Sequence, residues 1–262
     1  MAQTSPTMNI MIAAARKAAR ALARDFGEVE NLQVSRKGPA DFVSSADLKA
    51  EKTLFEELSK ARPGYSFLME ERGAVEGTDK SHRWIVDPLD GTTNFLHGIP
   101  HFAISIGLER EGVLVAGVVY NVVRDELFWA EKGVGAYLND RRLRVAGRSE
   151  MRDALFGTGA PYHGRPGQEL FLEEVGRVIA VSAGVRRMGS AALDLAYVAA
   201  GRYDGFWERD LSAWDIAAGA VLVREAGGFA KEIDGGDFLK TGAIVAANER
   251  LLPLLTKTIR NT

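Results

Sequence analysis

The 262-residue sequence contains no cysteine. Disulfides, zinc–thiolate sites and cysteine nucleophiles are therefore excluded. The absence is consistent with a reducing compartment, although it does not require one. A chain of this length can bury a full hydrophobic core without such cross-links, either as one large domain or as two closely fused halves.

Long apolar runs and a strong excess of one charge are also missing. Hydrophobic residues make up 46% of the chain and charged residues 26%, with a net charge of -2. The apolar stretch at residues 8–15 is too short for a membrane span, and Arg16 follows too soon for a signal peptide. The arginines at 141, 142 and 144 lie beside a turn signal, which favours a solvated hairpin edge. We therefore expect a cytoplasmic protein that binds neither membranes nor nucleic acid directly.

Two catalytic signatures are absent. The chain has no Gly-x-x-x-x-Gly-Lys-Ser/Thr phosphate loop and no Arg-His-Gly triplet, which argues against nucleoside triphosphate hydrolysis and against a histidine nucleophile. The histidines show no metal-ligand spacing, so we interpret all four as surface or hydrogen-bonded residues: His82, His97, His101 and His163.

Apolar residues recur with helical spacing in two N-terminal segments, residues 7–26 and 45–61. For the second helix we predict an apolar stripe of Leu48, Phe55 and Leu58. Apolar runs separated by turn signals follow, and they predict an antiparallel meander after a first strand at 65–69. The predicted strands of the meander are 83–86, 102–108, 113–120, 126–130 and 136–138.

Strands and helices alternate after residue 150. The predicted strands are 154–157, 185–188, 204–207 and 244–247, and the predicted helices are 168–180, 190–200, 212–226 and a last one capped by Asn248. On the first of these helices we expect one apolar face of Leu170, Phe171, Val175 and Ile179. The chain is therefore divided into residues 1–150, helices plus an antiparallel sheet, and residues 151–262, an α/β half. Both belong to one continuous structural unit of mixed α/β (α+β) class.

Acidic residues stand where predicted strands end and predicted helices begin. Such positions let polar groups face a shared cleft while the core stays apolar. The residues concerned are Asp47, Glu70, Glu71, Asp87, Asp90 and Asp215.

The densest of these segments runs from Trp84 to Asn94. A hydrophobic strand ends at Asp87, and Asp90 follows with the Leu89 carbonyl between them, which makes a hard, oxygen-rich site of the kind that magnesium prefers. Gly91 then allows close approach of an anion. An isolated Asp-Pro-x-Asp-Gly is more often a tight turn than a metal site. The presence of the other acidic residues at strand ends and helix starts favours the metal site.

Asp47 and Asp215 also have a structural interpretation. Ser44-x-x-Asp47 and Ser212-x-x-Asp215 both match a capping box at a helix start. Taken singly, each aspartate is a helix cap, but one carboxylate oxygen can cap while the other meets a metal. Adjacent acids such as Glu70 and Glu71 usually lie in a solvated loop, so this alternative stays open for that pair.

Three segments together resemble the inositol monophosphatase family, and most closely its bacterial branch. Asp87-Pro-Leu-Asp-Gly-Thr92 resembles the first signature of that family, and Trp214-Asp-Ile-Ala-Ala-Gly219 resembles the second. The stretch from Gly189 to Glu208 resembles the segment that joins them. The match covers nearly the whole chain in order.

The resemblance implies a layered αβαβα sandwich of the inositol monophosphatase and fructose-1,6-bisphosphatase type, in a homodimer. It also implies Mg²⁺-dependent hydrolysis of a phosphate monoester by metal-activated water, with two or three ions per active site and inhibition by lithium. Inositol 1-phosphate is the leading substrate.

The resemblance also implies roles for individual residues. By this resemblance, the metal-ligand roles of the family fall on Glu70, Asp87, the Leu89 carbonyl, Asp90 and Asp215. The catalytic roles of the family fall on Asp47 and Thr92, with Glu70 assisting. The substrate would contact Asp90, Gly91, Thr92, Gly189, Ser190, Ala191, Glu208 and Asp215. A basic residue of the family corresponds to either Arg36 or Lys37.

Other functions compete with this one. An aspartyl-phosphate phosphatase needs Asp-x-Asp, and the spacing of Asp87 and Asp90 is one residue too long. Relatives with the same signatures hydrolyse histidinol phosphate, fructose 1,6-bisphosphate or 3′-phosphoadenosine phosphate, and leaving-group contacts separate these substrates. Some bacterial relatives instead assist transcription or RNA maturation through protein contacts.

Overall fold

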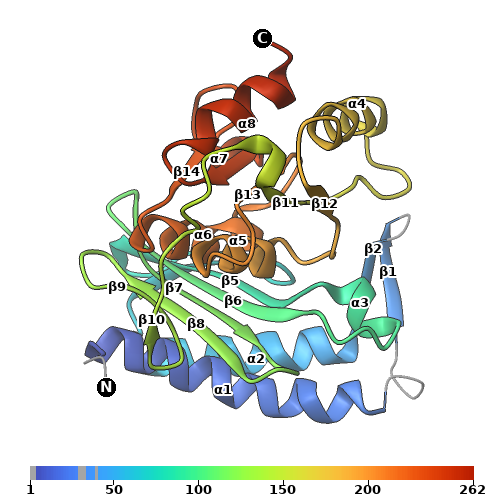
Figure 1. Cartoon of the computed structure of the whole chain (residues 1–262). Helices are drawn as coiled ribbons and strands as arrows, with labels where there is room; N and C mark the ends of the chain where they lie inside the picture. The colour runs from blue at the N-terminus through green and yellow to red at the C-terminus, as the bar shows by residue number, and fades with distance from the viewer. Residues whose placement is uncertain (1–3, 29–33, 39–40) are drawn as a thin grey trace.

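The chain folds into five alternating layers of helices and sheets (Figure 1). The structure, a computed structural model, describes residues 4–28, 34–38 and 41–262. Two long N-terminal helices cover one face of an eight-stranded sheet, and two buried helices separate its other face from a five-stranded sheet. Two further helices cover the outside of that second sheet. The predicted αβαβα sandwich is confirmed. Among the described residues, no helix combines the length and apolarity that crossing a bilayer requires.

The first layer is the helix pair α1 (Pro6–Phe26) and α2 (Ser45–Ala61), as predicted. The Ser44 cap of α2 forms the predicted capping box with Asp47. The predicted stripe of α2 is partly wrong, because Leu48 is 54% exposed and Leu54 is buried instead. Helical spacing alone cannot tell which neighbouring residue faces the partner helix.

The large sheet has the order β10-β9-β8-β7-β6-β5-β3-β4. All neighbours from β5 to β10 are antiparallel, which confirms the meander, whereas β3 and β5 are parallel. The short strand β4 and the separate hairpin β1–β2 had no sequence prediction. The strands are β1 (Val34–Gly38), β2 (Asp41–Ser44), β3 (Tyr65–Met69), β4 (Gly73–Val75), β5 (Asp79–Asp90), β6 (Ala103–Arg110), β7 (Val113–Asn121), β8 (Glu126–Glu131), β9 (Gly135–Leu138) and β10 (Arg141–Arg142). The short helix α3 (Thr92–Leu96) follows β5.

The smaller sheet has the order β12-β11-β13-β15-β14. β11 is parallel to both β12 and β13, and the other pairs are antiparallel. The strands are β11 (Leu155–Thr158), β12 (Gly184–Arg186), β13 (Gly205–Glu208), β14 (Phe229–Glu232) and β15 (Ile244–Ala247). All but β14 were predicted to within two residues. The expected boundary near residue 150 lies between the two sheets, but the division into halves stays a prediction.

The buried central layer consists of α5 (Ala191–Ala199) and α6 (Ala213–Glu225). α6 approaches the large sheet closely because β6 and β7 carry glycines beneath it. A Cβ on Gly107 would lie 2.9 Å from that of Ala217, and a Cβ on Gly117 would lie 2.5 Å from the Ala218 carbonyl oxygen. This close packing brings the start of α6 to the end of β5.

The outer layer contains α4 (Gln168–Ile179), α8 (Leu251–Arg260) and the short element η2 (Met151–Asp153), whereas the short helix α7 (Phe238–Thr241) packs against α6 and β14. The predicted apolar face of α4 is wrong in part. Leu170 is 41% and Ile179 55% exposed, whereas Glu174 and Val178 are buried. The predicted role of Asn248 is supported, because its Oδ1 accepts from the backbone N–H groups at the start of α8.

Candidate active site

Two aspartates at the end of β5 and a third, distant in sequence, at the start of α6 converge in space. One carboxylate oxygen from each of Asp87, Asp90 and Asp215 lies within 4.8 Å of the other two. The pairing of β5 with β6 is interrupted between Asp87 and Asp90, and the Leu89 carbonyl there accepts a hydrogen bond from the Thr92 hydroxyl at 3.1 Å. The strand end therefore turns two carboxylates toward the first turn of α6.

Burial and mutual repulsion make it energetically unfavourable for all three carboxylates to be ionised at once. Burial raises the pKa of Asp87 well above its usual range, and the charges of Glu70, Asp90 and Asp215 raise it further. The pKa of Asp215 is also raised well above its usual value, first by burial and then by Asp90. Burial raises the pKa of Asp90 to about 6, although hydrogen bonds from Ser190 and the nearby backbone oppose the shift. A bound cation would remove much of this cost.

Asp47 links helix capping to the same site. Its Oδ2 accepts the Ser44 backbone N–H at 2.9 Å, and its Oδ1 accepts from the Thr92 hydroxyl at 3.1 Å. The side chain is fully buried, and this burial raises the pKa of Asp47. Asp215 likewise accepts the Ser212 backbone N–H at 2.7 Å. Capping therefore leaves one oxygen of each aspartate available to the site.

The segment before α5 is anchored on Asp90. The Asp90 Oδ2 accepts from the Ser190 hydroxyl at 2.5 Å and from the Ala192 backbone N–H at 2.8 Å. Gly91 has a φ of 97°, and a Cβ there would lie 3.2 Å from the Gly189 carbonyl oxygen. This position therefore needs glycine both for its conformation and for space.

A cavity of about 440 Å³ opens above the aspartates. Nine of the predicted site residues line it, whereas Asp47, Asp87 and Leu89 are buried and are not among its lining residues. The nine are Glu70, Asp90, Gly91, Thr92, Gly189, Ser190, Ala191, Glu208 and Asp215. Burial, together with Asp215 and Asp90, raises the pKa of Glu208 to about 8.

Sequence reasoning missed the loop between β11 and α4, which forms one wall of this cavity through Gly159, Tyr162 and Arg165. The Arg165 guanidinium lies 4.6 Å from the Tyr162 ring centre and donates to the Asp210 carbonyl oxygen at 2.7 Å. No motif marks this loop, and only its place beside the end of β13 points to it. The side chains of Arg36 and Lys37 lie outside the described part of the structure, so neither is assigned here.

The interpretation of the histidines is wrong for His101. This side chain is 4% exposed, and its Nε2 has no hydrogen-bond partner among the described residues. Burial lowers the pKa of His101 to about 4, so the ring is neutral at pH 7. By contrast, His82 is hydrogen-bonded to Asp79 at 2.8 Å, as expected.

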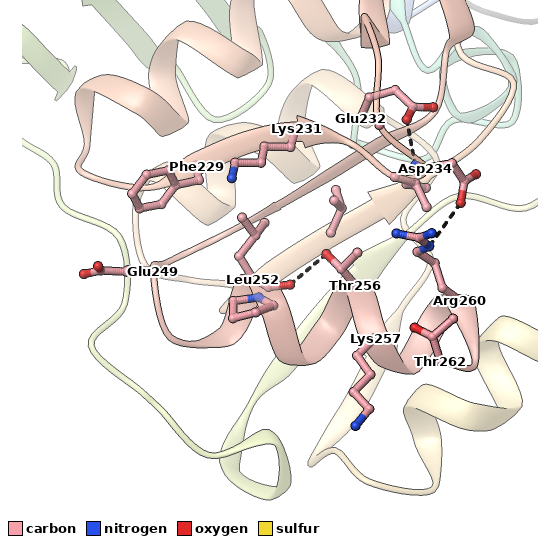
Figure 2. A pocket seen from close by; sticks show the side chains of 14 residues that line it. Phe229, Lys231, Glu232, Asp234, Glu249, Leu252, Thr256, Lys257, Arg260 and Thr262 are labelled. Atoms are coloured by element: carbon pink, nitrogen blue, oxygen red, sulfur yellow. Dashed lines mark hydrogen bonds and ion pairs between the residues drawn. The ribbon is translucent and has the colours of Figure 1, made fainter.

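A second cavity lies elsewhere, between β14 and α8 (Figure 2). Its volume is about 770 Å³, but its acids do not converge. Figure 2 shows Asp234 paired with Arg260, with a separation of 3.4 Å, and Glu249 at the opposite end. The smaller acidic cavity is therefore the candidate active site.

Comparison with known proteins agrees with this geometry. The model of the inositol monophosphatase family matches residues 3–262. The chain belongs to this family. It is 64% identical over 257 residues to a protein of Mesorhizobium japonicum named inositol-1-monophosphatase, covering 98% of this chain and 97% of that protein.

Two further relatives carry a different name. A Pseudomonas aeruginosa protein named Nus factor SuhB is 45% identical over 260 residues, covering 97% of this chain and 96% of that protein. The crystal structure of extragenic suppressor protein suhB from Bartonella henselae matches with a TM-score of 0.95 and 57% identity, covering 98% of this chain and 99% of that one. The predicted family, layered fold and phosphatase class are all confirmed.

Proposed function

We propose that the chain is a Mg²⁺-dependent phosphomonoesterase that acts on inositol 1-phosphate or a similar polyol monophosphate. The observation that carries the proposal is the convergence of Asp87, Asp90 and Asp215 within 4.8 Å beside a cavity of about 440 Å³. Carboxylate and carbonyl oxygens are the ligands that Mg²⁺ prefers, and the ion keeps water and phosphate oxygens in its shell. The residues present therefore fit the ion.

The proposed ligands are the three aspartates, Glu70 and the Leu89 carbonyl, which together would hold two or three ions. When bound, Mg²⁺ neutralises phosphoryl oxygens, lowers the pKa of water and stabilises the leaving alkoxide. Glu70 lines the cavity, and its charge acts on the pKa values of Asp87 and Asp215, which supports its place in the set.

Asp47 and Thr92 are proposed to position and deprotonate the attacking water. The single Thr92 hydroxyl proton points to either the Asp47 carboxylate or the Leu89 carbonyl, each 3.1 Å away. The oxygen lone pairs of Thr92 are then left to accept a hydrogen bond from water. When the Thr92 proton is donated to Asp47, a proton of the attacking water can pass to the Thr92 oxygen while the Thr92 proton passes to the Asp47 carboxylate. Water activated in this way needs no protein nucleophile, so we propose direct in-line attack without a phosphoenzyme. Trapping a phosphorylated residue during turnover would refute this step.

The substrate contacts are proposed on either side of the acids. Backbone groups of Gly91 and Thr92 would hold the phosphate, with Asp90 and Asp215 beside it. Gly189, Ser190, Ala191 and Glu208 would meet the hydroxyl groups of the alcohol. The name of the Mesorhizobium relative supports inositol 1-phosphate as the substrate.

A phosphate-release assay tests the proposal. We expect Mg²⁺-dependent, lithium-inhibited hydrolysis with a higher kcat/KM for inositol 1-phosphate than for histidinol phosphate, fructose 1,6-bisphosphate or 3′-phosphoadenosine phosphate. Asp87→Asn should lower kcat about a hundredfold or more. The matched control is Asp237→Asn, on an exposed helix cap where Asn serves as well. Activity without Mg²⁺, or a many-fold preference for histidinol phosphate, would contradict the proposal.

We further propose that the chain is a cytoplasmic homodimer, on the basis of the family resemblance, and sedimentation equilibrium would test its mass. A second role in transcription, through protein contacts, is supported by the name of the Pseudomonas relative. Asp87→Asn separates the two functions in cells. If growth phenotypes are rescued while phosphatase activity is lost, the protein-binding role is the primary one.

A further inference from the structure

Gly159 and Glu208 lie side by side at the ends of neighbouring strands. β11 and β13 are parallel, with Thr158 opposite Trp207, so the next residues along the two strands are also neighbours. The Thr158 hydroxyl donates to the Trp207 carbonyl oxygen at 2.8 Å and fixes this register. Both Gly159 and Glu208 line the acidic cavity.

The Glu208 carboxylate occupies the space that a side chain at residue 159 would need. A Cβ on Gly159 would overlap the Glu208 Cδ and both carboxylate oxygens, closer than 3.0 Å in each case. Those atoms are the three nearest neighbours of that position. The absence of a side chain at residue 159 therefore leaves room chiefly for the Glu208 carboxylate.

The backbone of Gly159 does not itself call for glycine. It is absent from the glycines with a positive φ, in contrast to Gly91 and Gly189. Alanine could adopt the same conformation, so its cost would come from the contact with Glu208. Because the atoms concerned are the far end of a flexible side chain, that side chain can move away.

We propose that Gly159 is a positioning residue that sets where the Glu208 carboxylate stands in the cavity, and so which alcohols the site accepts. This inference rests on the proposed function, in which Glu208 meets the hydroxyl groups of the substrate. A side chain at residue 159 displaces the carboxylate and misplaces its hydrogen bonds to a polyol. It leaves the aspartates, which serve any phosphate monoester, in place.

Kinetics on two substrates test this role. Inositol 1-phosphate carries hydroxyl groups for Glu208, whereas 4-nitrophenyl phosphate carries none. For G159A we expect the KM for inositol 1-phosphate to rise about tenfold with kcat within about twofold, and both constants for 4-nitrophenyl phosphate to stay within about twofold. E208A should produce the same pattern, and the double variant should be no worse than E208A alone. The matched control is G176A, where a Cβ meets no atom within 4 Å.

Equal losses on both substrates, or additive losses in the double variant, would overturn the proposal. If G159A does not fold, G159A/E208A should fold because the overlap is gone, and failure of both variants would also overturn it. Absence of inositol 1-phosphate hydrolysis by the wild type refutes the proposed function instead. In that case crystal structures of the wild type and G159A decide the matter. A displaced Glu208 carboxylate on an unmoved backbone supports the proposal, and an unmoved carboxylate with a shifted backbone refutes it.

Discussion

Removing one charge from the acidic cluster should stabilise the protein without Mg²⁺ and destabilise it, relative to the wild type, with Mg²⁺. Asp215→Asn is the most informative change, because the Asn Oδ1 can still accept the Ser212 backbone N–H that Asp215 accepts at 2.7 Å. The capping contact is kept, and only the negative charge is lost.

The magnitude follows from the spacing of the carboxylates. Two charges no more than 4.8 Å apart repel by at least about 3.5 kcal/mol at an effective dielectric constant of about 20. Proton uptake and partial exposure of Asp215 to water reduce the net effect, so we expect a gain of about 1–3 kcal/mol in the free energy of unfolding at pH 8 in EDTA. Each kcal/mol corresponds to a rise of about 2–4 °C in Tm for a chain of this size.

Thermal and urea unfolding, in EDTA and in saturating Mg²⁺, measure this change. The wild type should gain about 2–3 kcal/mol at a hundredfold excess of Mg²⁺ over its Kd, and the variant much less. Asp204→Asn is the matched control, because Asp204 is buried but paired with Arg148 at 3.2 Å. That variant should lose about 1–3 kcal/mol in both conditions. If Asp215→Asn is less stable than the wild type in EDTA, the reasoning about repulsion is refuted.

Three more predictions concern pH, packing and capping. The pKa of Asp90 is raised to about 6 in the folded state, so its contribution to stability is complete below about pH 4 and is lost as pH rises through 6. The free energy of unfolding in EDTA should therefore fall by about 1–2 kcal/mol from pH 5 to pH 8. A flat profile would contradict this prediction. Gly117→Ala should lower stability in urea by about 1–3 kcal/mol, because its Cβ would lie 2.5 Å from the Ala218 carbonyl oxygen; an unchanged midpoint would show that α6 can move. Asn248→Ala should cost about 2–4 kcal/mol with kcat unchanged, because the side chain donates to two carbonyl oxygens and accepts from two N–H groups.

Long amphipathic helices and the meander were predictable because their signals are local and repeated. Strands β5 to β9 of the meander were all expected, although β5 (Asp79–Asp90) begins earlier than its apolar run, and the two residues of β10 (Arg141–Arg142) were expected only as a hairpin edge. Short strands such as β4 (Gly73–Val75) were missed, because three residues carry no measurable period. The buried face of α4 was misjudged, since the buried Glu174 carboxylate accepts hydrogen bonds from Trp207 and Arg209, which are distant in sequence.

The candidate site also contains residues that the sequence predicted and residues that it did not. The acids at strand and helix ends were found because Pro, Gly and capping serines mark those ends in the sequence. The loop that brings Gly159 and Arg165 to the cavity was missed, since neither residue belongs to a local pattern. The environment of His101 also depended on packing, because nothing in its sequence neighbours indicates burial.

The sequence by itself determined which residues could bind a cation: Asp87 ends a hydrophobic strand, and Asp215 stands in a capping box. Their distance was decided only by the tertiary structure. The glycines of β6 and β7 allow α6 to approach the sheet closely, which brings the start of that helix to the end of β5. Helix capping and turn conformation act between near neighbours in the chain, whereas convergence of the three carboxylates to within 4.8 Å requires the packing of whole layers.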